Sequence, residues 1–399
     1  MPTYGNEKTE WYIDSKGEVA LKIGDIIYGK KTEEMEKDET PGDITDEGKQ
    51  DGSEEKPYKI RSIEDLVAFS KEVNEKGMKN KYIELEKSLD FEKESSYVDS
   101  KSKEYGDINN DGKIEELKEE LLSGEGLTPI GNNKSHKFSG FFLGKGFEIN
   151  NIYQNSKTIA GLFGYVGNAT ISDLSISGKL ISNNGSAGGI IAVNNDFTAT
   201  VNILNCSNKC EIIANLVTQY NGVGGIVGGG NTTSSNLNII NCYNEGTITL
   251  NKVESSYHPA VGAGGIIGSY RGSKVLNIHN SYNAGEIIST VDGAGILGGT
   301  WAEGKINVVN CCNYGKISAG TVYNISNTSA NTSTSINNCY YLENNYNGKD
   351  SSFATSYVND EITDTINKLN NYVLTDAIND ISWKKWIKGK NGPVFEVNS

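Results

Sequence analysis

The chain has 399 residues, of which 36% are hydrophobic and 22% are charged, and its formal net charge is -14 at pH 7. Such an acidic chain repels phosphate backbones, so nucleic acid is disfavoured as a partner. No apolar run comes near the ~20 residues that a membrane-spanning helix needs, so we expect no membrane span. The many Lys and Asn residues beside only two Arg are typical of AT-rich genes, such as those of many low-GC Gram-positive bacteria.

The first 57 residues divide into two segments. In residues 1–30, two alternating runs at 11–14 and 19–23 flank a turn that contains Gly17, which predicts a small β-hairpin. Residues 31–57 consist largely of Glu, Asp, Lys, Gly and Thr, and such a segment cannot bury enough apolar surface to fold. It is therefore interpreted as a flexible acidic linker. No secretory leader precedes these segments, so we expect either an intracellular protein or part of a longer polypeptide.

Residues 58–149 are interpreted as an N-terminal cap region. Ser62 followed by Asp65 resembles a capping box. Leu66, Phe69 and Val73 recur at helical spacing, which predicts an amphipathic helix over about residues 63–74. We expect its apolar side to cover the end of the domain that follows.

Within this cap region, residues 107–118 resemble a calcium-binding loop. Oxygen-bearing side chains occupy four alternate positions, 107, 109, 111 and 115, and Gly112 lies where such loops turn sharply. Position 12 is Lys118 instead of the usual bidentate Glu, so an acidic surface turn is the alternative. The predicted cofactor is calcium, and its predicted ligands are Asp107, Asn109, Asp111, Lys113 and Glu115.

Residues 150–350 are repetitive. A glycine-led apolar segment recurs roughly every 28 to 40 residues, and an Ile-Asn segment that ends in Asn-Cys or Asn-Ser recurs between its copies. Each period contains three short segments rich in β-branched residues, without a helical stripe. The shortest period is too short for a propeller blade and suits one rung of a parallel β-helix. We therefore predict an all-β fold, a right-handed parallel β-helix (a solenoid) with helical end caps.

Equivalent residues of successive rungs in such a fold stack about 4.8 Å apart. We expect stacked Ile side chains to fill the core, and one Asn of each rung to turn the corner at positive φ while its amide hydrogen-bonds along the stack. These asparagines are Asn208, Asn244, Asn283 and Asn313. Another position holds a Cys in four rungs and Ser281 in a fifth, which favours buried free thiols over disulfides or a metal site. The four thiols are Cys206, Cys242, Cys311 and Cys339.

Residues 351–399 are interpreted as a C-terminal cap. Ile362, Ile366, Leu369 and Val373 recur at helical spacing and predict a second helix. The last apolar residues, which include two Trp, predict a final lid over the end of the solenoid; they are Trp383, Trp386, Val394 and Phe395.

Several of these motifs together resemble the GLUG-motif family of bacterial surface proteins. The resemblance covers about residues 58–399 and depends on segments 58–66, 128–131, 138–140 and 160–164 and on the Asn-Cys-Tyr-Asn-x-Gly repeats. Related repeats occur in the N-terminal regions of immunoglobulin-A-cleaving metallopeptidases. The resemblance implies a cell-surface or secreted solenoid used as an adhesin, stalk or host-contact module. No His-Glu-x-x-His motif is present, so it implies no catalytic zinc.

Candidate functional residues are aromatic rather than catalytic. Flat rings in one row make a plausible platform for a sugar or peptide, although they also suit the mere covering of a rung corner. The predicted ligand-binding residues are Tyr243, Tyr282, Tyr340 and Trp301. The acidic residues of the repeats are scattered instead of paired, which disfavours glycoside hydrolysis or elimination. We expect a non-catalytic module that binds glycan or host protein. The alternatives are a polysaccharide lyase or hydrolase, and an accessory region of a larger secreted peptidase.

Overall fold

The computed structural model consists of two units, Met1–Asp51 with Glu94–Lys118 and Gly52–Lys93 with Glu119–Ser399, and each is described by itself. In the first unit, β1 (Thr9–Ile13) pairs antiparallel with β2 (Val19–Ile23), and β2 pairs with a third strand, β3 (Ile26–Tyr28). The structure describes residues 9–13, 19–23, 26–28, 50–92, 124–194, 196, 198–218, 221–229, 236–254, 261–301, 304–327, 333–343, 354–357, 361–373 and 381–396.

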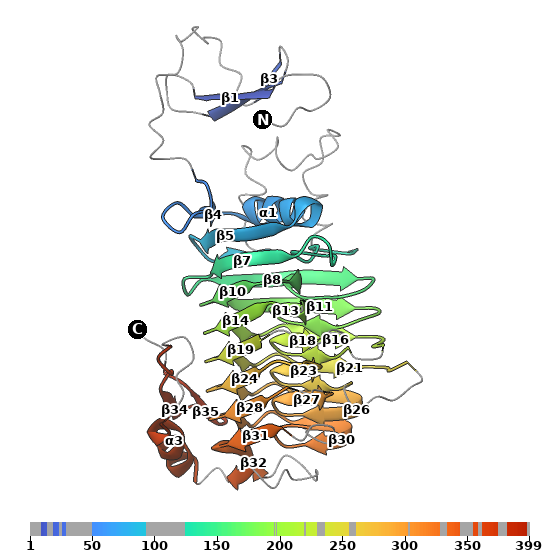
Figure 1. The fold of residues 1–399 in the computed structure, drawn as a ribbon, viewed down its shortest axis with the longest axis vertical. Helices are drawn as coiled ribbons and strands as arrows, with labels where there is room; N and C mark the ends of the chain where they lie inside the picture. Colours follow the sequence, from blue (N-terminus) through green and yellow to red (C-terminus); the bar gives the residue numbers. More distant parts are fainter. Residues whose placement is uncertain are drawn as a thin grey trace. The chain divides into compact units, whose positions relative to one another are not determined.

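The second unit is a parallel β-solenoid, which confirms the predicted fold class (Figure 1). The first of its two large sheets contains 14 strands among the described residues. One part of this sheet comes from the glycine-led segments: β9 (Phe163–Val166), β13 (Ile191–Asn194), β18 (Val227–Gly229), β23 (Ile267–Tyr270) and β27 (Leu297–Thr300). The other part comes from the start of the unit and from the Ile-Asn segments: β4 (Tyr58–Ile60), β5 (Met78–Leu85), β7 (Phe138–Leu143), β10 (Ala169–Ser172), β14 (Thr200–Leu204), β19 (Asn236–Ile240), β24 (Leu276–His279), β28 (Ile306–Val309) and β31 (Thr334–Asn337).

The second large sheet contains 16 strands among the described residues. Its first strands are β6 (Leu89–Asp90), β8 (Glu148–Ser156) and β11 (Ser175–Ser182). Directly after each Asn corner come β15 (Ser207–Asn208), β20 (Tyr243–Asn244), β25 (Tyr282–Asn283), β29 (Cys312–Asn313) and β32 (Cys339–Leu342), and β33 (Ala354–Tyr357) pairs with β32. The remaining strands are β12 (Ala187–Gly188), β16 (Glu211–Ala214), β17 (Val223–Gly224), β21 (Ile248–Leu250), β22 (Ala263–Gly264), β26 (Ile287–Ala294) and β30 (Ile317–Tyr323).

The core consists of apolar side chains stacked in register. Ile203 pairs with Ile239, Ile239 with Ile278, and Ile278 with Val308, as the repeats predict. All four side chains are fully buried. A second stack of Ile residues, one from each glycine-led segment, is buried to the same degree: Ile190, Ile226, Ile266 and Ile296. Because each buried apolar residue packs on the equivalent residue of the preceding rung, burial fixes the register between neighbouring rungs.

A row of asparagine amides runs through the core, and we call it the inner ladder: Asn208, Asn244, Asn283 and Asn313. Asn208 Nδ2 donates to Asn244 Oδ1 (2.7 Å), Asn244 Nδ2 donates to Asn283 Oδ1 (2.8 Å), and Asn283 Nδ2 donates to Asn313 Oδ1 (2.9 Å). This confirms the predicted hydrogen bonding along the stack. The ladder ends at Asn313, whose Nδ2 donates to the main-chain oxygen of Asn324 (3.2 Å).

The prediction that these inner asparagines turn the corner at positive φ is wrong. The left-handed residues lie three positions earlier in each rung, as Asn205 (φ 56°), Asn241 (56°) and Asn310 (57°) illustrate. Their side chains form a second row of amides along the corner, which we call the outer ladder: Asp173, Asn205, Asn241, Asn280, Asn310 and Asn338. The inner asparagines instead belong to extended two-residue strands, so their amides point into the core.

The inner ladder explains why each glycine-led segment begins with Gly. A Cβ at Gly225 would press against the side chain of Asn244, and one at Gly265 would press against Asn283. The first copy of the segment has no inner asparagine opposite it. There, Gln154 hydrogen-bonds the main chain of Gly161 in both directions (2.9 and 3.0 Å). Glycine and a core amide therefore form one packing unit in each rung.

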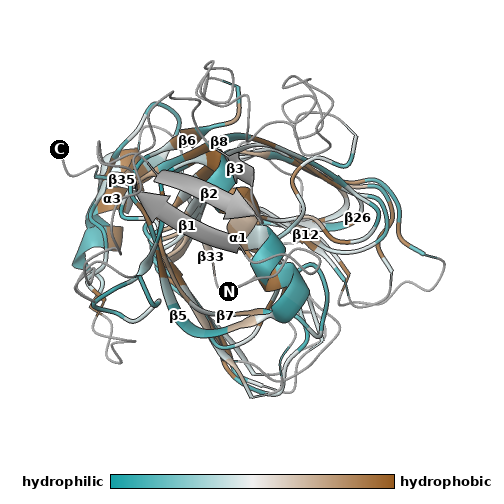
Figure 2. Cartoon of the chain, turned by 90° about the horizontal axis from the view of Figure 1, so that it is seen from above, coloured by the Kyte–Doolittle hydropathy of each residue, from teal (hydrophilic) through white to brown (hydrophobic). Residues whose placement is uncertain are grey.

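Helix α1 (Ile63–Lys76) covers the first rungs, as expected (Figure 2). Ser62 Oγ caps it by accepting the N–H of Asp65 (3.2 Å), which satisfies a helix-end donor. Phe69 lies on the buried side of the helix and contacts the rings of Phe138 and Phe142, with ring centroids 5.9 and 6.1 Å away.

The C-terminal residues lie along the side of the last rungs, where Figure 1 draws them in red. Helix α3 (Ile362–Asn371) forms as predicted, but it ends before Val373, which is 81% exposed because the chain is already extended at Tyr372. Beyond it, β34 (Trp386–Lys388) pairs antiparallel with β35 (Pro393–Phe395). Among the described residues, neither helix is long and apolar enough to cross a membrane.

Candidate functional site

The outer face of the solenoid carries a regular array of polar side chains. It consists of the outer ladder and, directly after each corner, a row of side chains that we call the outer column. Strand register places one residue of every rung in this column: Glu148, Ser175, Ser207, Tyr243, Tyr282, Cys312 and Tyr340. The column is therefore polar in its first three rungs and mainly aromatic afterwards.

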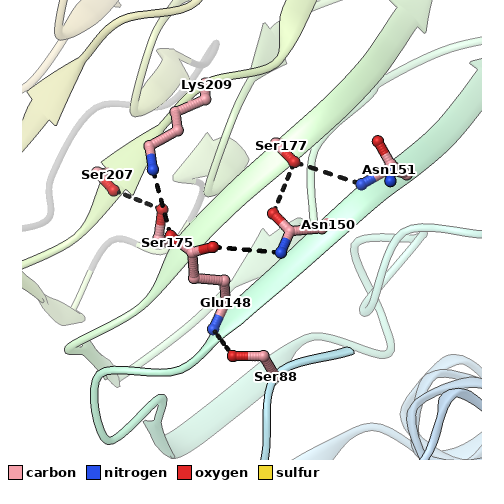
Figure 3. Close-up of polar contacts among 8 residues, drawn as sticks. All are labelled: Ser88, Glu148, Asn150, Asn151, Ser175, Ser177, Ser207 and Lys209. Carbon is pink, nitrogen blue, oxygen red and sulfur yellow. Dashed lines mark hydrogen bonds and ion pairs between the residues drawn. The ribbon is translucent and has the colours of Figure 1, made fainter. Parts of the chain in front are cut away.

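The polar half of the face is organised around Glu148 (Figure 3). Glu148 Oε2 accepts a hydrogen bond from Asn150 Nδ2 (3.2 Å), and Oε1 accepts one from Lys209 Nζ (3.2 Å). Lys209 belongs to the rung of Ser207, so its side chain spans the rung between. In that rung, Ser175 Oγ accepts the hydroxyl of Ser207 (2.8 Å).

A β-bulge brings two asparagines of β8 opposite one serine of β11. The register shifts beside Ser177, and Asn151 adopts φ 59°. Ser177 Oγ donates to Asn150 Oδ1 (2.8 Å) and accepts the main-chain N–H of Asn151 (3.3 Å). The bulge thus orients the Asn150 amide so that its other end meets Glu148, in keeping with the use of bulges to redirect side chains.

The electrostatics of this cluster favour binding over proton transfer. The hydrogen bond from Asn150, followed by that from Lys209, lowers the pKa of Glu148 although burial opposes the shift. Burial opposes charge on Lys209 as well, but Glu148 and the nearby Glu245 raise the pKa of its amine. At neutral pH the pair is therefore a carboxylate and an ammonium group. A neutral amine for nucleophilic attack or a protonated carboxyl for general acid catalysis is disfavoured.

The aromatic half of the outer column is covered by the chain itself. Tyr243 and Tyr282 stack with ring centroids 4.8 Å apart, and the ring of Phe395 lies edge-on against Tyr282 at 5.1 Å. Trp386 is fully buried in the same cluster. The residues predicted as a lid over the end of the solenoid thus lie over this column instead.

This cover changes the interpretation of the predicted ligand-binding residues. Of the two interpretations of this row, a ligand platform and the covering of a rung corner, burial favours the second for Tyr282 and Tyr340, which are 2% and 6% exposed. The reason is that residues from the end of the chain pack on them, whereas Tyr243 is only half-buried. Trp301 is 45% exposed, but it follows β27 in the other large sheet and so lies outside the outer column. A ligand-binding role for these four residues stays a prediction.

The predicted calcium ligands, Asp107, Asn109, Asp111, Lys113 and Glu115, lie outside the described residues. Within the described residues, no group of three or more His, Cys, Asp or Glu side chains could hold a metal ion. Calcium binding by residues 107–118 stays a prediction.

The cysteines are free and buried, as predicted. Their side chains lie inside the coil, where Cys242 Sγ donates to the main-chain oxygen of Ile203 in the preceding rung (3.4 Å) and Cys311 Sγ to that of Ile278 (3.4 Å). Burial raises the pKa of Cys210 and Cys312 far above the usual thiol range. These thiols are therefore inert packing residues rather than nucleophiles.

His279 lies under the C-terminal residues and is 3% exposed. Its strand neighbours are Ile240 and Val309, and the Trp383 ring lies 6.0 Å from its own. Neither ring nitrogen has a hydrogen-bond partner in the described part of the chain. Burial lowers the pKa of His279 to about 4, so the imidazole is neutral in the folded protein at neutral pH.

We predict that His279 makes the folded protein sensitive to acid. Between pH 6.5 and about 4, the unfolded chain binds a proton at this residue that the folded chain does not bind, so stability falls as the pH falls. The loss from pH 8 to pH 5 should be roughly 2 kcal/mol. His279→Ile, which continues the apolar stack, should remove this part of the pH dependence. Guanidinium unfolding of both proteins at the two pH values measures it, and equal pH dependence would contradict the prediction.

The fold and the outer face define the class of the protein as a parallel β-solenoid with a polar face that its own C-terminal residues partly cover. No protein-family model, curated protein or solved structure matches the chain. Sequence patterns had not indicated the Glu148–Lys209 pair or the outer ladder. The recurring Asn before each Cys was a signal for the ladder, but only the backbone shows which Asn is left-handed.

Proposed function

We propose that the chain is a non-catalytic module of a bacterial cell-surface or secreted protein, an adhesin or stalk whose outer face binds glycan or a host protein. The observation that carries the proposal is the outer face itself, where amides, hydroxyls and one ion pair follow each other from rung to rung. Rows of fixed donors and acceptors suit recognition of an extended partner, because each rung can contribute one or two hydrogen bonds. The resemblance to GLUG-motif proteins supports the location.

An array of glycans and extracellular-matrix proteins, probed with the full chain, tests this proposal. We expect binding to at least one class of partner. Glu148→Gln should weaken that binding about tenfold or more, because it removes the carboxylate around which the polar half is organised. The matched control is Glu211→Gln, which breaks an ion pair with Lys179 of similar length (2.8 Å) beyond this cluster. No binding, or equal loss in both variants, would count against the proposal.

Each of the two alternative functions can be tested by one measurement. Release of reducing or unsaturated sugars from a polysaccharide panel would favour a hydrolase or lyase. An open reading frame that continues into a peptidase domain would favour an accessory region of a larger secreted peptidase.

A further inference from the structure

The C-terminal residues show how the outer ladder binds a polypeptide. Asn241 Nδ2 donates to the main-chain oxygen of Ser382 (3.0 Å), and Asn241 Oδ1 accepts the main-chain N–H of Lys384 (3.1 Å). One rung further, Asn280 Nδ2 donates to the main-chain oxygen of Lys384 (3.0 Å). Two residues of extended chain thus correspond to one rung. Three of the ladder's hydrogen bonds to this segment, residues 381–386, are to its backbone, which any sequence possesses. A fourth is to a side chain, because Asn280 Oδ1 accepts the indole N–H of Trp386 (2.6 Å).

Each covered amide uses its full hydrogen-bonding capacity. An Asn amide has two N–H donors and two acceptor lone pairs. Within the ladder, Asn241 Nδ2 donates to Asn205 (2.9 Å) and Asn241 Oδ1 accepts from Asn280 (2.8 Å). The second N–H and the second lone pair of the Asn241 amide bind the main chain of residues 381–386. The covered residues Asn241 and Asn280 are fully buried as a result.

The ladder continues past this segment toward the first rungs. Asn205 donates to Asp173 (2.8 Å) and accepts from Asn241. Within the described residues, its second donor and second acceptor have no partner. Both Asn205 and Asp173 are only half-buried, in contrast to the covered rungs. One further rung, that of Asn205, therefore presents the same donor and acceptor as the covered amides. The next rung presents the carboxylate of Asp173, which only accepts hydrogen bonds.

Charge favours a basic occupant for these rungs. Asp173 ends the ladder, and Glu148 and Glu245 lie close to Lys209, whose ammonium group pairs with Glu148 (3.2 Å). The other neighbouring lysine, Lys145, precedes Gly146, whose N–H donates to the main-chain oxygen of Asp173, and pairs with Glu84 (3.1 Å). The segment that the ladder already holds contains two lysines, Lys384 and Lys385, and Lys388 follows it. A net charge of -14 on the whole chain attracts such a segment at long range.

We propose that the outer ladder is a docking row for peptide main chain, and that Asp173 and Asn205 take an extended, lysine-bearing segment of a partner protein. The inference rests on the proposed binding function and names its partner class. The partner's backbone continues the row of hydrogen bonds that residues 381–386 begin, and its lysine side chains face Glu148 and Glu245.

A fluorescently labelled synthetic octapeptide with the sequence of residues 381–388 is the probe, titrated into the full chain by fluorescence anisotropy. We expect saturable binding. Asn205→Gly keeps the left-handed backbone without strain and removes the amide, so it should weaken binding about five- to tenfold. Asn215→Ala, in a row of amides on another part of the surface, is the control and should change binding less than twofold.

A second peptide tests for recognition of the backbone. N-methylation at the residue that matches Lys384 removes one main-chain donor and leaves every charge in place. We expect a loss similar to that of Asn205→Gly, whereas equal binding of both peptides would overturn the docking row. Binding that depends on Asn241 but not on Asn205 would mean exchange with the chain's own C-terminal residues and would also overturn it. If the chain binds a partner on the array but does not bind the octapeptide, the proposed function stands and the docking row is contradicted.

Discussion

Replacing Asn244 by Leu is expected to lower the free energy of unfolding by about 4 kcal/mol. The change keeps the approximate volume of the side chain but removes three buried hydrogen bonds, to Asn208, Asn283 and the main-chain oxygen of Gly246. The partners would stay buried without a replacement, and each unsatisfied group costs about 1–3 kcal/mol. Guanidinium unfolding, followed by circular dichroism and by tryptophan fluorescence, measures the loss.

The matched control is Asn251→Leu. Asn251 belongs to an exposed row of amides, where its Nδ2 donates to Asn215 Oδ1 (2.9 Å). Water replaces this bond, so the variant should stay within about 1 kcal/mol of the original protein. Equal effects of the two substitutions would show that the inner ladder adds nothing beyond ordinary surface hydrogen bonds.

Gly265→Ala is expected to destabilise the protein by about 3 kcal/mol or more, or to prevent folding. The added Cβ would press against the main-chain oxygen of Gly295 and the side chain of Asn283, and neither can move without shifting a rung. Thermal unfolding and the yield of soluble protein measure the effect.

Gly146→Ala separates this clash from the conformational effect of losing a glycine. Gly146 has φ 84°, and a Cβ there would meet no atom within 4 Å. Alanine at such a position costs about 1 kcal/mol from its backbone conformation alone. A Gly265→Ala variant no less stable than Gly146→Ala would refute the packing of glycine against core amide.

The repeats were sufficient to predict the fold because like residues recur at equivalent positions. The stack of Ile203, Ile239 and Ile278, the buried thiols and the amide row through Asn244 all follow from that periodicity. Two features could not be predicted in this way. Asn recurs at several positions of each rung, and sequence alone does not show which one adopts positive φ.

The second feature is the cover over the aromatic half of the outer column. The contact between Trp386 and Asn280 joins residues that are 106 positions apart, outside any repeat. The apolar character of these aromatic residues indicated that they would be buried. Because they belong to no repeat, the sequence could not show which rungs they contact. The Glu148–Lys209 pair could not be predicted for a similar reason, since the two residues are 61 positions apart and occupy different positions of their rungs.

The amide rows have a direction as well as a position. In the outer ladder each Nδ2 donates toward the start of the chain, as Asn280 does to Asn241, whereas in the inner ladder Asn244 donates toward the end, to Asn283. Every internal rung therefore presents the same donors and acceptors above and below. A complete rung inserted by gene duplication would find its hydrogen-bonding partners already in place. The length of the solenoid can consequently change in whole rungs, while a partial insertion would leave amides facing the wrong atoms.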